Sequence, residues 1–386
     1  MKLLKLFIPL FFVSLILNCS GGSGQGTFFR INQVAVDSVN DRLFVSQNTQ
    51  ELFVLEASTQ DSIGDQPFVS EDNDETTAAL LPAIVSGMVV YRTGSTSRLF
   101  ILGTIANTTG DLVLNRIRVL DFDGTTFSEA SFSPIVLSDG DGATDETDNA
   151  MADILVDQAN GYVFVSDASG EVLYILDADD GSTVAGPLNI AGTPQGMALD
   201  SNNRLYVCNS SDLDAEQLIT VVNLNDFSTT TIDVEIPCSV IAVASTADAT
   251  VMLVKNSERS QVKIREVNTT TYASSTAVAS TYAGLSDGNL EGGSGITSAI
   301  GDIVVQADDD GIFNAYLSEV DGNVQQITIT ANGDEYEELT FSTSATNIDG
   351  GTSFTPSSGS DLIFFAAETG ALVVIDPAEA TVRVRD

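Results

Sequence analysis

The sequence predicts an all-β protein. Short apolar runs rich in Val, Ile, Phe and Tyr alternate with turns of Gly, Asn, Asp and Ser along most of the chain. No long stretch shows the 3.6-residue spacing of apolar side chains that an amphipathic helix requires. Hydrophobic residues make up 43% of the 386 residues. Because that fraction is sufficient for a large core, we expect ordered β-structure rather than global disorder.

A pattern of four strands recurs along the chain, and its clearest copy runs from residue 173 to 209. In each unit a polar turn, a short loop and a second turn separate the strands, and the third strand tends to end in an acidic residue. Units begin near residues 33, 85, 152, 195, 239, 301 and 353. Their spacing of roughly 50 residues is typical of propeller blades. We therefore predict a single seven-bladed β-propeller of four-stranded antiparallel blades over residues 27–386, with six or eight blades as the alternatives.

The sequence leaves the closure of this ring open. The last unit carries all four of its strands at the C-terminus. Either the last blade packs directly on the first, or residues 27–30 add an edge strand to it.

The clearest unit carries a recognisable residue pattern. Its marked positions are Asp177, Thr183-Val184, Gly192, Pro194, Gly196 and the run Tyr206-Val207-Cys208-Asn209. In these positions the unit resembles the YVTN family of propeller repeats. The resemblance implies a propeller fold. It implies no particular ligand, since the family includes surface proteins, binding modules and a few enzymes.

The N-terminus reads as a targeting segment. Two lysines precede an apolar run over residues 6–17, which is too short to span a bilayer comfortably. Cys19 follows this run and precedes a Gly/Ser-rich tether. The arrangement resembles a bacterial lipoprotein signal peptide, which implies cleavage before Cys19, acylation of Cys19 and export across the inner membrane. Residues 1–18 are then the signal peptide and 19–26 the lipidated Cys and tether.

This resemblance predicts the location of the protein. The lipid would anchor the chain to a membrane of the bacterial cell envelope, and Ser20 after Cys19 favours the outer membrane. More than one acyl chain is needed for stable anchoring. An ordinary signal peptide with an incidental Cys and a retained membrane anchor are the alternatives.

Two further cysteines, Cys208 and Cys238, form an even pair in a chain that we expect to be exported. Cys208 ends the second strand of one unit, and Cys238 begins the first strand of the next. In a propeller these two points lie on the same face of neighbouring blades. We predict a disulfide between them, with two free buried thiols as the alternative.

The chain is strongly acidic, with 54 Asp and Glu against 15 Lys and Arg and a formal net charge of −39. A surface of this sign repels nucleic acid and anionic lipid headgroups. Nucleic acid is therefore excluded as a partner. The acidity serves either solubility or dedicated cation binding.

The composition also restricts the chemistry. The sequence contains no His, which excludes His general bases, Ser-His-Asp triads and His metal ligands. It contains no Trp. The remaining ligand groups are carboxylate, amide, hydroxyl and backbone oxygens, the set that Ca²⁺ prefers.

The densest acidic segment contains Asp139, Asp141, Asp145 and Asp148. Grouped carboxylates repel one another unless they are solvated or bind a cation. The segment is therefore either a calcium site or a solvated acidic loop. By contrast, Asp37, Asp157 and Asp200 recur at the end of the first strand of their units, where we expect each to cap the following turn.

Three long polar inserts, at residues 62–81, 138–150 and 280–297, join an outer strand to the next inner strand. Loops on a rigid scaffold often carry function. We therefore expect a lipid-anchored, non-catalytic module that binds a protein, peptide or glycan partner through its loop-rich face. The alternative is a Ca²⁺-dependent, lactonase-like hydrolase with carboxylate and Asn ligands at the central channel. A third alternative is a purely structural envelope protein.

Overall fold

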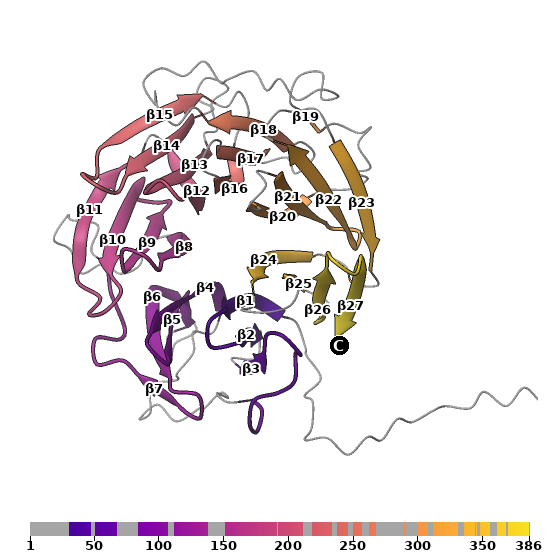
Figure 1. The fold of residues 1–386 in the computed structure, drawn as a ribbon. Coiled ribbons are helices and arrows are strands. Elements are labelled where there is room, and N and C mark those ends of the chain that lie inside the picture. Colours follow the sequence, from indigo (N-terminus) through magenta and orange to yellow (C-terminus); the bar gives the residue numbers. More distant parts are fainter. Residues whose placement is uncertain are drawn as a thin grey trace, which may run out of the picture.

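The computed structural model is a ring of β-sheets built in chain order (Figure 1). It describes residues 31–47, 51–67, 84–106, 112–137, 151–190, 192–210, 218–233, 238–245, 250–256, 262–267, 289–290, 300–307, 312–330, 336–343, 345, 348–355, 361–367 and 370–385. Within these ranges no helix is long and apolar enough to cross a membrane.

The first sheet has three strands, and the other six have four each. The first contains β1 (Ile31–Asp37), β2 (Arg42–Gln47) and β3 (Leu52–Glu56); the second, β4 (Ile84–Thr93), β5 (Thr96–Ala106), β6 (Leu112–Phe122) and β7 (Phe127–Glu129). The third contains β8 (Met151–Asp157), β9 (Tyr162–Asp167), β10 (Val172–Asp177) and β11 (Thr183–Asn189); the fourth, β12 (Thr193–Leu199), β13 (Arg204–Ser210), β14 (Leu218–Asn223) and β15 (Thr229–Asp233).

The remaining three sheets complete the ring. The fifth contains β16 (Cys238–Ser245), β17 (Thr250–Asn256), β18 (Val262–Val267) and β19 (Asn289–Leu290); the sixth, β20 (Ile300–Ala307), β21 (Ile312–Glu319), β22 (Asn323–Thr330) and β23 (Tyr336–Ser342). The seventh contains β24 (Ile348–Phe354), β25 (Leu362–Ala367), β26 (Leu372–Asp376) and β27 (Thr381–Arg385).

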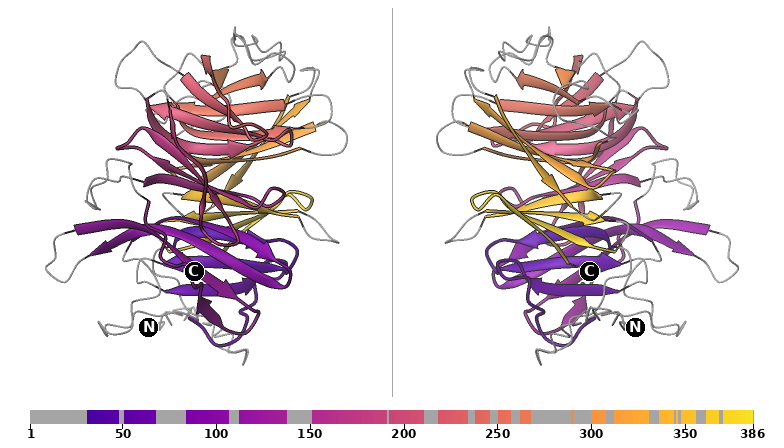
Figure 2. Two further views of the ribbon diagram at one scale, coloured as in Figure 1. Left: turned by 90° about the vertical axis from the view of Figure 1, so that its left-hand side faces the viewer. Right: turned by 90° about the vertical axis from the view of Figure 1, so that its right-hand side faces the viewer.

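Adjacent strands within every sheet are antiparallel and follow one another along the chain. The first strand of each sheet contacts the first strand of the next, and β24 contacts β1. These strands surround the centre of the ring (Figure 1). In side view the sheets are twisted, and the long β5–β6 hairpin projects past its neighbours (Figure 2).

The prediction of an all-β propeller with four-stranded antiparallel blades is confirmed. Six sheets are complete four-stranded blades. The sequence predicted seven blades, and six was one of its two alternatives. The three-stranded sheet β1–β3 takes the remaining place in the ring. The predicted fourth strand is absent from the described residues of that sheet.

A folded segment covers the outer edge of β3 in place of a fourth strand. The Gln66 side chain donates from Nε2 to the Val54 carbonyl at 2.9 Å and accepts from the Val54 N–H at Oε1 at 3.1 Å. The N–H of Ile63 also donates to the Val54 carbonyl, at 3.0 Å. One side-chain amide thus imitates a paired strand backbone. An edge strand treated in this way is less available for pairing with another chain.

Apolar packing closes the ring among the described residues. The first and seventh sheets share a core cluster of Val34, Leu43, Val45, Phe53, Leu55, Ala57, Leu362, Phe364, Ala366, Leu372 and Val374. Arg385 at the end of β27 donates to the carbonyls of Gln60 and Thr59 beside β3. This arrangement is the direct packing that the sequence allowed; residues 27–30, the other alternative, lie outside the described ranges.

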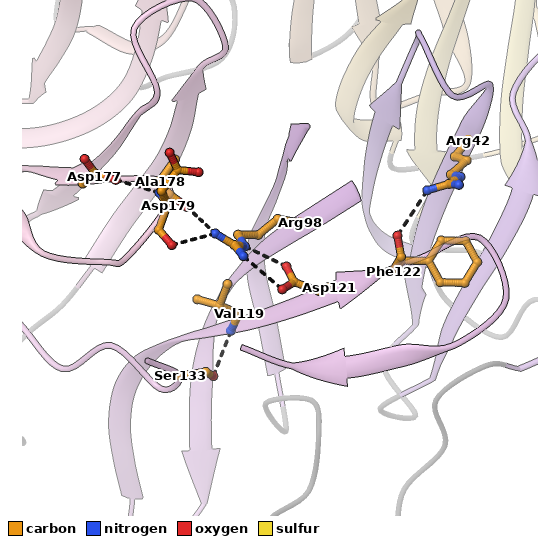
Figure 3. A network of polar contacts seen from close by, with 9 residues as sticks. All are labelled: Arg42, Arg98, Val119, Asp121, Phe122, Ser133, Asp177, Ala178 and Asp179. Atoms are coloured by element: carbon orange, nitrogen blue, oxygen red, sulfur yellow. Dashed lines mark hydrogen bonds and ion pairs between the residues drawn. The ribbon is translucent and has the colours of Figure 1, made fainter. Parts of the chain in front are cut away.

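Two arginines, each near the start of the second strand of its sheet, form hydrogen bonds to the next sheet; we call these contacts the arginine clasps (Figure 3). Arg98 on β5 forms an ion pair with Asp121 at 2.7 Å and donates to the carbonyls of Ala178 and Asp179 in the next sheet, at 3.0 and 2.8 Å. Arg42 on β2 occupies the equivalent position one sheet earlier. It donates to the Phe122 carbonyl at 3.2 Å and lies over the Phe122 ring. These clasps fix the relative positions of the first three sheets.

Candidate functional site

A cavity of about 550 Å³ occupies the centre of the ring. The first strand of every sheet contributes to its lining. Its size falls within the range of roughly 300–1,000 Å³ that is common for small-molecule sites. The cavity is therefore the first candidate for a binding site.

Every lining strand carries a shift of register near its first residues. Directly after the shift stand Gln33, Gly87, Asp153, Val240 and Gly351, while Gly196 and Asp302 lie within the shift on β12 and β20; all seven line the cavity. A bulge bends a strand and re-aims its side chains. We call the end of the ring where these strands begin the insert end, since 138–150 and the residues after 290 lead directly into β8 and β20.

Asp153 sits at the bulge of β8 and joins two sheets. Its Oδ1 accepts from the N–H of Ile154, and its Oδ2 accepts from the N–H of Met197 on β12, each at 2.8 Å. Its own N–H donates to Ser166 Oγ at 3.0 Å, and that hydroxyl donates to the Gln195 carbonyl at 3.2 Å. The carboxylate is held in one orientation from both sides.

Asp302 makes the same set of bonds three sheets further on. Its Oδ1 accepts from the Ile303 N–H at 2.8 Å, and its Oδ2 accepts from the Gly351 N–H of β24 at 2.5 Å. Ser318 Oγ accepts from the Asp302 N–H at 2.8 Å and bonds to the Ile348 carbonyl at 3.0 Å. Two sites that share these bonds therefore face the cavity, one from the third sheet and one from the sixth.

The preceding residue, Gly301, explains the close approach of the sixth and seventh sheets. A Cβ atom at this position would lie 1.9 Å from the carbonyl oxygen of Ile348. Any side chain here would therefore force the two innermost strands apart.

Burial raises the pKa of Asp153 to about 7, the negative charge of Asp302 raises it too, and the N–H groups of Met197 and Ile154 oppose the shift. By accessible surface Asp153 is only half-buried, because it faces the cavity, yet the surrounding strands remove it from bulk water. Charge on this carboxylate is costly until a cation or a proton neutralises it.

The rest of the described lining carries no charge. Its polar groups come from the hydroxyls and amides of Gln33, Ser86, Gln158, Gln195, Ser239 and Thr352. Met88, Met197 and several Val and Ile residues supply apolar surface. No Lys, Arg or aromatic side chain is among the described lining residues.

The carboxylates at the other end of the innermost strands cap turns, as predicted. Asp37 Oδ1 accepts from the N–H of Asn40 at 3.1 Å, and Asp157 Oδ1 accepts from the N–H of Ala159 at 2.8 Å. Asp200 Oδ1 accepts from the N–H of Asn202 at 2.8 Å. We call this the turn end of the ring.

Cys208 on β13 and Cys238 on β16 meet as disulfide partners between the fourth and fifth sheets. Their Cα atoms are 5.1 Å apart, and both residues are fully buried. The pair lies at the insert end, since Cys238 immediately precedes the bulge of β16. We predict that this disulfide is formed in the isolated protein.

The other predicted site residues lie outside the described ranges. These are the lipidation site Cys19 and the candidate calcium ligands Asp139, Asp141, Asp145 and Asp148. Among the described residues, no group of three or more His, Cys, Asp or Glu side chains is arranged to hold a metal ion.

Asp153 and Asp302 were missed as site residues, although the sequence holds a signal for them. Both stand in a shared pattern, Asp-Ile followed by two apolar residues, at the start of the first strand of a unit. The pattern begins only two of the seven units. It is therefore not part of the repeat, and the repeat does not mark these two residues.

Comparison with known proteins adds no relative. No family model matches the chain, and no curated protein matches its sequence. The resemblance of residues 173–209 to the YVTN repeat therefore stays a prediction, and the propeller rests on the geometry of the sheets.

Proposed function

We propose that this chain is an exported, lipid-anchored propeller that binds a protein, peptide or glycan partner at the insert end without catalysis. The observation that carries the proposal is the central cavity, whose lining bulges lie where the innermost strands begin. The inserts at 138–150 and 280–297 precede two of those strands in the chain. Partner-binding loops and a concave centre would then form one surface.

The anchor places this surface close to a membrane. Acylation at Cys19 and a tether over residues 20–26 would hold the ring at an average distance of about 15 Å. We propose the cell envelope, and the outer membrane within it, as the location. Labelling with radioactive palmitate should be lost in Cys19→Ala and kept in Cys208→Ala.

Site-specific photo-crosslinking tests the partner proposal. A photoreactive residue at Ser169, in the β9–β10 turn at the insert end, should yield a discrete crosslinked product in intact cells. The same residue at Val39, in the β1–β2 turn at the turn end and 70% exposed, should not. Equal products from both positions, or none from either, would argue against a partner-binding insert end.

A Ca²⁺-dependent hydrolase is the second candidate, and one observation favours it. Asp153 reaches the cavity with a pKa of about 7, a value suited to a general base. Both of its oxygens already accept backbone N–H bonds, which suits a structural and ligand-orienting role better. Addition of Ca²⁺ and then EGTA tests this candidate: a shift in melting temperature, together with Ca²⁺-dependent lactone hydrolysis lost in Asp153→Asn, would establish it.

A further inference from the structure

We propose that the central cavity binds a single-chain amphiphile, with its alkyl chain against β1, β4 and β8 and an uncharged hydroxyl or amide head at the insert end. Such a ligand is distinct from the partner proposed above, because it lies inside the ring. The shape of the cavity, the order of polar and apolar groups along it, its depth and its charge support this ligand class.

The cavity is lined unevenly along its length. At the insert end, the innermost strands of all seven sheets contribute lining residues. On four of these strands the described lining stops close to the bulge, at Met197, Ile241, Ile303 and Thr352. It continues toward the turn end along β1, β4 and β8, which are neighbours in the ring. The cavity therefore has a mouth formed by every sheet and a deep part against the first three sheets.

The mouth of the cavity is polar. Gln33, Ser86, Gln195 and Thr352 bring two amides and two hydroxyls to it, each within a bulge or beside one. Amide and hydroxyl groups can both donate and accept hydrogen bonds. The chemistry of the mouth therefore suits an uncharged head that does the same.

The deep part of the cavity is apolar. Four of its lining side chains are apolar and only partly buried: Val36, Val89, Leu155 and Val156. The polar residue at the far end, Gln158, uses its amide on β4, where it accepts from the Arg92 N–H at 3.0 Å and donates to the Val90 carbonyl. An alkyl chain against these walls would remove apolar surface from water, which is favourable.

The depth of the apolar part sets the length of the chain. From Ser86 to Val90 the lining of β4 extends over about 13 Å at the rise of a strand. An extended alkyl chain advances roughly 1.25 Å per carbon, from the length and angle of saturated bonds, so about ten carbons cover this depth. The cavity volume of about 550 Å³ is within the range of small-molecule sites.

The charge of the mouth selects against an acidic head. Asp153 lies there and accepts from the N–H groups of Ile154 and Met197. No Lys or Arg side chain is among the described lining residues. A carboxylate head would lose water without gaining an opposite charge and would lie near a like charge. We therefore expect fatty alcohols and amides to bind and fatty acids to be rejected.

Calorimetric titration with a series of alcohols tests the proposal. The protein is the full-length Cys19→Ala chain, which cannot be acylated at residue 19 and is studied without detergent. Affinity should rise about fourfold for each methylene from hexanol to decanol, the increment for burying one CH₂ group, and level off at dodecanol. Decanamide should bind like decanol. Decanoate at pH 8 should bind at least about tenfold more weakly than decanol.

The head also identifies the source of the ligand. A monoacylglycerol from a membrane and a free alkyl alcohol share the chemistry described above. Tighter binding of decanoylglycerol than of decanol identifies a lipid-derived ligand, and equal or weaker binding identifies a free amphiphile.

Matched variants separate binding from folding. Val36→Phe fills the deep part, so decanol should bind at least about tenfold more weakly while hexanol is little affected. Val39→Phe, in the turn that follows and 70% exposed in the wild type, should leave the whole series unchanged. An effect that depends on chain length cannot come from a folding defect. Asp153→Asn should bring the affinity for decanoate close to that for decanol.

Four results would overturn the proposal: equal affinity for all alcohols, decanoate binding as tightly as decanol in the wild type, equal effects of Val36→Phe and Val39→Phe, or no binding of decanol up to its solubility. Binding of decylamine more than about tenfold tighter than decanol would assign the head to a cation and overturn the uncharged head. The Ser169 crosslink tests the partner proposal separately, because it does not require an occupied cavity.

Discussion

The two ends of the innermost strands use the same side chain for different purposes. At the turn end, Asp37, Asp157 and Asp200 bond to N–H groups two or three residues ahead in their own turns. At the insert end, Asp153 and Asp302 bond to N–H groups of the next sheet, 44 and 49 residues away. Asp37 also accepts from Ser97 Oγ in the next sheet, at 2.6 Å. An Asp in a turn therefore stabilises first of all its own turn, whereas an Asp at a bulge connects sheets and faces the cavity.

The connections between sheets differ between the ends as well. Arg42 and Arg98 reach neighbouring carbonyls at the turn end. At the insert end, two carboxylates and the Cys208–Cys238 pair cross the boundaries between sheets. Polar groups at the insert end thus serve both the ring and its cavity.

Loss of the disulfide should have the largest effect on stability. The two cysteines are 30 residues apart, and a loop of this length predicts a loss of about 3 to 4 kcal/mol in the free energy of unfolding. Cys208→Ser and Cys238→Ser should be destabilised equally in urea. Thiol titration of the unreduced, denatured wild type should find neither of these thiols free. Two reactive thiols would show that the pair is reduced.

Removal of a bulge carboxylate should cost more than removal of a turn cap. Asp302→Ala leaves the Gly351 N–H without its acceptor, and we expect a loss of about 2 to 3 kcal/mol. Asp157→Ala removes the acceptor of a partly exposed turn cap and should cost about 1 kcal/mol. Urea unfolding of the two variants makes the comparison directly. Equal losses of unfolding free energy in the two variants would mean that Asp residues at the two ends contribute equally to stability.

The pH dependence of stability should distinguish Asp153. Its pKa of about 7 in the folded protein lies above its unfolded value of about 3.9, so the folded state binds the proton more tightly. Stability should therefore fall as pH rises from about 4 to about 7 and level off above. We expect about 2 kcal/mol across this window, less than full linkage because the carboxylate faces the cavity. The fall should be absent in Asp153→Asn, measured by urea unfolding at each pH; an unchanged fall would assign the effect to other groups.

The smallest effect should come from the clasp at the turn end. Arg98→Lys keeps the charge but loses the paired contact with Asp121 and the fork that reaches Ala178 and Asp179. We expect a loss of about 1 kcal/mol, measured as a lower urea midpoint. Arg92→Lys, on the neighbouring strand β4, is the matched control. A loss larger than that of Asp302→Ala would reverse the ranking of the two ends.

Prediction from the sequence succeeded where the interactions are local. The turn caps were found because Asp37, Asp157 and Asp200 bond within a few residues of themselves. The meeting of Cys208 and Cys238 followed from the repeat, since a fixed period brings equivalent positions of adjacent blades together. Neither inference needed the details of packing.

Prediction failed where a contact depends on how sheets meet. Nothing near Asp153 or Asp302 in the chain shows that the N–H groups that donate to them lie on the next sheet. The edge of β3 is similar, because the Gln66 amide and the backbone of Ser62 and Ile63 take the place of a strand. A side chain that forms the hydrogen bonds of a strand backbone leaves no periodic pattern of apolar residues in the sequence.

The sequence by itself determined the all-β repeat, the order of the sheets and the capped turns. These follow from strand periodicity and short-range hydrogen bonding, which are encoded within each unit. Only the tertiary structure decided that the first sheet has three described strands, that packing closes the ring, and that Asp153 and Asp302 face one cavity. The physical reason is that bulges, close approaches and shared carboxylates arise between units, where the relative position of two sheets selects the partner.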